Sequence, residues 1–116
     1  MADAPTPDAV DTAVDRLAQL SADSFRDCLN QTFQITVPGL PEPLATELVD
    51  VRGLGGYTER EDRQPFSLLF RGPADAPLQQ GIYQLENETL GALSIFLVTV
   101  GPDPKDRDMR YEAVFT

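Results

Sequence analysis

Apolar and polar side chains alternate along much of the chain after residue 31, with the two-residue period that is typical of β-strands. The alternation is strictest at residues 66–71, where three bulky apolar residues share one face. Gly72 and Pro73 follow, and since proline cannot donate a ladder hydrogen bond, the strand should end there. The same pattern predicts six strands, at residues 32–37, 44–52, 66–71, 79–86, 90–100 and 109–115.

Two of these segments depart from simple alternation. Residues 90–100 carry apolar side chains on both faces, which predicts a central strand covered on both sides. Their β-branched and aromatic content favours a strand over a helix. In residues 44–52 the alternation breaks at Leu48 and Val49, which allows a β-bulge.

Short polar connections set the expected order of the strands. Residues 86–89 form a polar turn, so the strands on either side should pair as an antiparallel hairpin. The last strand should pair with the first and close the sheet. We expect a mainly β (α+β) fold, in which a six-stranded antiparallel meander forms a small barrel or compact sandwich with one or two N-terminal helices packed on it.

The N-terminal part has helical rather than strand spacing. Residues 1–5 form a loose lead-in, and Thr6 and Pro7 are suited to start a helix with one apolar stripe. That stripe docks either on the sheet of its own domain or in the groove of a partner protein. Ser21 should cap a second, shorter helix in which Phe25, Cys28 and Leu29 face together, with Phe25 and Leu29 anchored.

The chain should form a single domain at residues 6–116, with a helical segment at 6–29 and an antiparallel β domain at 32–116. Its net charge of −10 is spread along the sequence. Nucleic acids and anionic membranes select basic surfaces, so we expect neither as a partner. An acidic N-terminus and the lack of a long apolar run favour a cytoplasmic location.

The residue types that support common catalysis are scarce. The sequence contains no histidine and a single cysteine, Cys28, on the apolar side of the second helix. The lack of histidine therefore excludes Ser-His and Cys-His nucleophiles and the usual zinc sites. We expect no enzyme, catalytic residue, cofactor or metal. Asp103, Asp106 and Asp108 lack the spacing of a calcium loop. Glu86 and Glu88 are interpreted as solvated turn residues.

Two residues stand out as candidate partner contacts. Tyr57 lies in the polar segment 53–65, where an aromatic side chain on a loop is suited to contact another protein. Arg71 ends an apolar run, and its guanidinium should either bind a partner or form an ion pair that holds the fold, with an acid such as Glu112.

The segments PFSLLFRGP, LQQGIYQLENETLGALSIFLVTVG and RYEAVF together resemble a family of small bacterial proteins classed as a domain of unknown function. The resemblance covers about residues 22–116 and includes DSFRDCLNQTFQITV, with Thr99 standing where the family pattern tends to proline. It implies a shared fold and carries over no catalytic residue. Some relatives are encoded beside phage tail-collar-like proteins, which implies an accessory or assembly role.

Two functions remain as hypotheses, with the oligomeric state open. The first is a non-enzymatic structural or accessory protein that binds another protein, such as a phage-tail or collar-like partner. The alternative is a small-ligand-binding β-barrel with an enclosed apolar cavity, for which small interior residues such as Gly81 and Ala113 would leave room.

Overall fold

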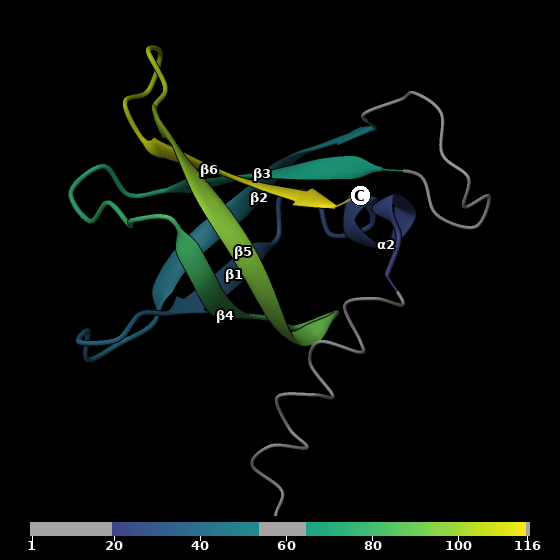
Figure 1. The fold of residues 1–116 in the computed structure, drawn as a ribbon, viewed down its shortest axis with the longest axis horizontal. Helices are drawn as coiled ribbons and strands as arrows, with labels where there is room; N and C mark the ends of the chain where they lie inside the picture. Colours follow the sequence, from purple (N-terminus) through teal and green to yellow (C-terminus); the bar gives the residue numbers. More distant parts are fainter. Residues whose placement is uncertain (1–19, 54–64, 116) are drawn as a thin grey trace, which may run out of the picture.

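The computed structural model describes residues 20–53 and 65–115, and in this part of the chain one short helix accompanies six strands (Figure 1). The elements are α2 (Ala22–Arg26), β1 (Thr32–Thr36), β2 (Leu44–Gly53), β3 (Phe66–Gly72), β4 (Gly81–Asn87), β5 (Gly91–Pro102) and β6 (Met109–Phe115). All six predicted strands are confirmed, with ends that differ by at most a few residues. Residues 1–5 and most of the first expected helix lie outside the described residues.

The strands close into a barrel in which every neighbouring pair is antiparallel, in the order β1-β2-β3-β6-β5-β4. The barrel is confirmed, but the expected pairing of the last strand with the first is wrong. β6 pairs with β3, from Phe66 opposite Phe115 to Gly72 opposite Met109, and β1 pairs with β4. The chain therefore forms two three-stranded meanders, and the segment between β3 and β4 crosses from one to the other instead of making a hairpin.

Two irregularities bend the strands. The register of β2 shifts between Leu48 and Asp50, which confirms the predicted bulge, and β5 shifts between Thr99 and Gly101. β5 pairs with β4 through Gly91–Leu97 and with β6 only from Val98 onward. Figure 1 shows β5 running diagonally across the barrel and separating from β6 along its first half.

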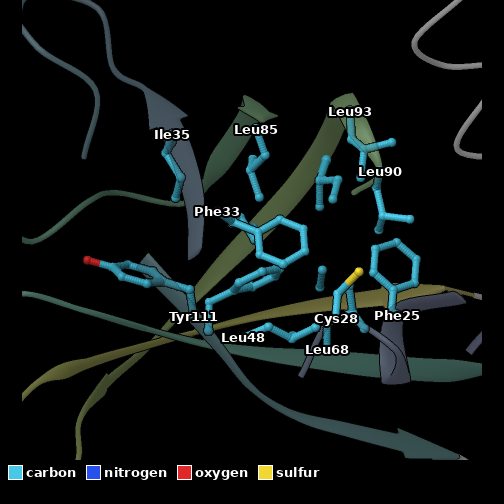
Figure 2. Packing of buried hydrophobic residues seen from close by; sticks show 14 of the residues in the cluster. Phe25, Cys28, Phe33, Ile35, Leu48, Leu68, Leu85, Leu90, Leu93 and Tyr111 are labelled. Carbon is cyan, nitrogen blue, oxygen red and sulfur yellow. The ribbon is translucent and has the colours of Figure 1, made fainter. Parts of the chain in front are cut away.

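The interior of the barrel is filled by large side chains (Figure 2). Phe33 and Phe70 meet edge to face at 5.3 Å between ring centroids, and Tyr111 is fully buried beside them. The Tyr111 hydroxyl accepts a hydrogen bond of 2.8 Å from the backbone N–H of Leu78. Gly72 lies against this ring: a Cβ there would come within 3.1 Å of Tyr111 Cε2. A larger residue at this position would therefore require the Tyr111 ring to shift by a few tenths of an ångström.

The short helix α2 closes one end of the barrel. Ser21 caps it, as predicted, in a reciprocal capping box with Ser24. Phe25 packs against the rings of Phe66 and Phe115, with centroids 5.9 and 5.8 Å away. The prediction that Leu29 is anchored is wrong, because α2 ends at Arg26 and the following turn leaves that side chain 38% exposed. Among the described residues, no helix is long and apolar enough to cross a membrane.

The expectation that β5 is covered on both sides is also wrong for the described residues. Its inward side chains Leu93, Ile95 and Leu97 are buried, whereas Phe96 and Val100 are more than half exposed. A single sheet closed into a barrel has only one inner face, and no described element packs over the outside of β5. The apolar outward residues of this strand therefore need another explanation.

Candidate interaction surface

Exposed apolar side chains gather on the outside of β4, β5 and β6. Strand alternation directs them away from the core; pairing of β4 with β5 brings Ile82 beside Phe96, while Val114 lies beyond the β5–β6 ladder. We call this set, together with the half-buried Val98 between them, the outer apolar face; it consists of Ile82, Phe96, Val98, Val100 and Val114. Single exposed apolar residues are common on proteins, but a contiguous group on adjacent strands is typical of an interaction site.

The centre of the face is a cross-strand pair. Ile82 of β4 lies directly opposite Phe96 of β5, with exposed fractions of 73% and 51%. Val98 follows on the same side of β5, opposite Glu112 of β6, and Val114 is the next outward residue of β6. The strands hold these side chains in fixed register, so the surface is built on a rigid support.

Acidic side chains border the outer apolar face. Glu112 lies beside Val98 on the neighbouring strand, and Glu86 and Glu88 lie at the turn between β4 and β5. The ion pairs formed among the described residues include none of these three carboxylates. The border therefore carries negative charge that no described ion pair neutralises, although Glu112 lies close enough to the Arg52 guanidinium to interact with it electrostatically.

Arg71, a candidate contact from the sequence, lies elsewhere, in an ionic cluster on β2, β3 and β6. Its guanidinium donates to Glu47, which is directly opposite on β2, and lies 3.9 Å from carboxylate oxygens of both Asp106 and Asp108. The predicted ion pair with Glu112 is not formed, since that residue is opposite Leu69 instead. The cluster supports the fold-holding interpretation of Arg71, and a contact with a partner stays a prediction.

A second arginine completes the cluster. Arg110 lies opposite Arg71 in the register of β3 and β6, and it donates to Asp106 at 2.9 Å and lies 3.6 Å from Asp103. The hydrogen bond from Arg110 lowers the pKa of Asp106 below its ordinary value. The aspartates of the β5–β6 turn thus face two guanidinium groups, an arrangement that balances the repulsion between the arginines and fixes the turn.

The sequence analysis missed a buried polar network at the β4–β5 turn. Asn87 is buried, and its Oδ1 accepts hydrogen bonds from the backbone N–H groups of Thr89 and Leu90 at 2.9 Å. Its Nδ2 donates to Gln31 Oε1 and Thr32 O. The signal was present: an asparagine before a short turn that ends in Gly91, whose φ is 79°.

An open pocket of about 750 Å³ borders this network and is lined by polar residues: Asn30, Gln31, Thr32, Gln34, Glu86, Asn87, Glu88 and Gly91. Cys28 lies beneath it, fully buried, with Sγ 3.8 Å from Asn87 Oδ1. Burial, reinforced by the charge of Asp27, raises the pKa of the Cys28 thiol. A thiol held neutral and inaccessible acts as a small apolar side chain.

Tyr57, the other candidate contact, lies outside the described residues, so its position stays a prediction. Of the small interior residues expected to leave room for a ligand, Ala113 is buried in the packed core, and Gly81 lies at the start of β4 near the Tyr83 ring. The outer apolar face is therefore the candidate interaction surface that the described residues present.

Comparisons with known proteins confirm the resemblance to a domain of unknown function, while the bacterial origin and the phage-related gene neighbours stay predictions. No curated protein and no solved structure matches the chain. A family model does match, over residues 20–115, which include α2 and all six strands. The chain therefore belongs to the family described as a domain of unknown function, DUF6916.

Proposed function

We propose that this protein is a non-enzymatic accessory protein that binds another protein through the outer apolar face. The observation that carries the proposal is the Ile82–Phe96 pair, two large apolar side chains held in register on the outside of the barrel and more than half exposed. Placing such side chains in water is unfavourable by about 25 cal/mol per Å² of apolar area, so a partner that covers them gains that free energy.

The charge around the face indicates what kind of partner fits. Glu86, Glu88 and Glu112 border it and form no ion pair with the described residues. Complementary charge speeds association and selects among partners, so the partner surface should be apolar at its centre and basic at its rim. The identity of this partner as a phage-tail or collar-like protein, suggested by the gene neighbours of similar proteins, stays a prediction.

The alternative function, binding of a small ligand inside the barrel, has less support. Such a function needs an enclosed cavity, and the space between the strands is occupied by fully buried side chains that include Phe33, Phe70 and Tyr111 (Figure 2). The pocket of about 750 Å³ lies at the β4–β5 turn and is open and lined by polar residues, of which Asn87, Gln31 and Thr32 already bond with one another. We therefore do not favour this alternative.

Capture from a lysate of the native host tests the proposal. The tagged protein is compared with the double variant Ile82→Thr/Phe96→Thr, in which threonine retains β-propensity and removes apolar area. Leu40→Thr is the matched control, because Leu40 is also exposed but lies between β1 and β2. We expect a stoichiometric partner that the double variant loses and the control retains.

Two results would contradict the proposal. In one, the double variant and the wild-type protein capture the same partner in equal amounts. In the other, none of the three proteins captures a stoichiometric partner even at high loading, although the double variant and the control remain folded by circular dichroism.

A further inference from the structure

The barrel has an unpaired strand edge beside the outer apolar face. The β4 ladder covers Gly91–Leu97 of β5 on one side, and the β6 ladder begins only at Val98. Within the described residues, no strand pairs with the other side of Gly91–Leu97. β6 likewise continues to Phe115, although its ladder with β5 ends at Glu112. The two strands therefore diverge, as Figure 1 shows, and leave a wedge between them.

Within the described residues, this wedge leaves backbone groups of β5 without a ladder partner. In an antiparallel strand, alternate residues direct their N–H and C=O groups to opposite sides, so part of Gly91–Leu97 directs them away from β4. Such an edge is a template for pairing with another chain unless charges, proline or a covering segment block it. The outward side chains along this stretch, Ala92, Ser94 and Phe96, are neither charged nor proline.

The outer apolar face flanks the same edge on both sides. Phe96 lies on β5 at the edge, and Val114 lies on the part of β6 that has separated from β5. Both side chains are about half exposed. A strand that paired with β5 would place its own alternate side chains beside these two residues.

The acidic border determines the chemistry of that strand. Glu86 and Glu88 lie near the Gly91 end of β5, on the side where β4 pairs with it, and Glu112 lies where the wedge begins. A second copy of this chain would bring another net charge of −10 to this border, which opposes self-association. A segment that alternates apolar residues with lysine or arginine matches both the apolar face and the carboxylates.

We propose that the partner binds by strand addition: an extended segment, alternating apolar and basic residues, pairs with the open edge of β5 at Gly91–Leu97. This inference rests on the proposed function, because it specifies how the partner engages the outer apolar face. Main-chain hydrogen bonds provide affinity, and the side chains at Phe96, Val114 and the three glutamates provide selectivity.

A synthetic peptide tests the pairing directly. The probe has about seven residues, the length of the open edge, with valine alternating with lysine. Two further versions carry backbone N-methyl groups on one or the other set of alternate residues. A paired strand directs only one set of N–H groups at its neighbour, so one methylated peptide should bind about tenfold more weakly than the other. Titrations of the full-length protein, followed by fluorescence anisotropy, measure the difference.

Further measurements place the peptide and test the charge. We expect amide chemical shifts of Gly91–Leu97 to change most on binding, and a peptide with glutamate in place of lysine to bind at least about tenfold more weakly. Equal weakening by the two methylated peptides would overturn strand addition and leave the apolar contact intact. Equal binding of the acidic peptide would overturn the charge assignment.

Two outcomes separate this inference from the proposed function. No binding of the lysine peptide up to about millimolar concentration, which corresponds to about −4 kcal/mol, overturns strand addition by a basic segment. The lysate capture with the Ile82→Thr/Phe96→Thr variant still decides whether the outer apolar face binds a protein. A stable dimer in analytical ultracentrifugation that the same variant abolishes would instead assign the face to a second copy and overturn this inference.

Discussion

Ile82 and Phe96 face each other across β4 and β5 on the outside of the barrel, while Leu85 of β4 and Ile95 of β5 point into the core. The alternation of the strands thus separates two apolar sets in the same hairpin. The inward set is buried and stabilises the fold. The outward set is exposed, and the proposal that it binds a partner implies that it contributes little to stability.

This separation predicts that mutations of the inward and outward faces change the free energy of unfolding by very different amounts. Leu85→Ala should lower the free energy of unfolding by about 2–5 kcal/mol, because it leaves a cavity in the packed core. Ile82→Thr should change it by less than about 1 kcal/mol, since the side chain is mostly in water and threonine keeps the β-branch. Urea denaturation of the two variants checks the difference. A large loss for Ile82→Thr would mean that the outer apolar face supports the fold.

The contact of Gly72 with Tyr111 predicts a cost for a single methyl group. Gly72→Ala places Cβ about 3.1 Å from Cε2 of the Tyr111 ring, so the protein should lose about 1–3 kcal/mol of unfolding free energy through overpacking. Gly53→Ala is the matched control, because a Cβ at Gly53 would meet no heavy atom within 4 Å. In thermal denaturation, the melting temperature should fall for Gly72→Ala and should stay unchanged for Gly53→Ala. Equal melting temperatures would show that the ring moves aside freely.

Two buried ionisable side chains, Cys28 and Tyr111, predict that the protein loses stability at alkaline pH. Burial raises the pKa of Cys28 and of Tyr111 in the folded protein, relative to ordinary values of 9.0 and 10.0. Both groups are neutral below those values in either state, so their contribution is then fully present. As the pH rises further, the unfolded chain releases these protons first, and stability falls by at most about 1.4 kcal/mol per pH unit for each group.

Melting temperatures measured at several values between about pH 7 and about pH 11 check this prediction, because this range extends from below to above the ordinary pKa values of both groups. Cys28→Ala should remove the part of the decline that begins near pH 9.0, the ordinary thiol value. A decline of the same slope in the wild-type protein and in Cys28→Ala would show that the thiol is not the cause.

The ionic cluster predicts a loss of stability in acid. The hydrogen bond from Arg110 lowers the pKa of Asp106 below its ordinary value of 3.8, so its stabilising effect is present above that value and is lost as the pH falls through the lower, folded-state pKa. Asp106→Asn should therefore reduce the pH dependence of unfolding below about pH 4 and its dependence on salt. Asp75→Asn is the control, since Asp75 is exposed and outside the ion pairs of the described residues.

Unfolding in urea at several acidic pH values and salt concentrations compares the two variants. The expected result is a flatter profile for Asp106→Asn alone. Identical profiles for the wild-type protein and Asp106→Asn would contradict the role assigned to the cluster in fixing the β5–β6 turn.

The local structure was predictable from the sequence to the extent that it depends on local pattern. Alternation located the six strands, Ser21 identified the cap of α2, and the interrupted pattern at Leu48 identified a bulge. These features depend on residues close together in the chain, which is why one sequence suffices to find them.

The features that depend on distant residues were not predictable in the same way. Phe115 lies opposite Phe66 because the segment between β3 and β4 crosses the barrel, and no local pattern encodes that crossing. The apolar outward residues of β5 suggested a covered strand, because an interaction surface and a core face share one composition. Arg71 was expected to form an ion pair, but its partner Glu47 follows from the register of β2.

The most direct test of the central claim is the dissociation constant of the purified partner obtained by capture. Isothermal titration calorimetry compares the wild-type protein, Ile82→Thr/Phe96→Thr and Leu40→Thr. We expect the double variant to bind at least about a hundredfold more weakly, which corresponds to about 2.8 kcal/mol, and Leu40→Thr to bind like the wild-type protein. Equal dissociation constants for all three proteins would contradict the claim that the outer apolar face is the binding surface.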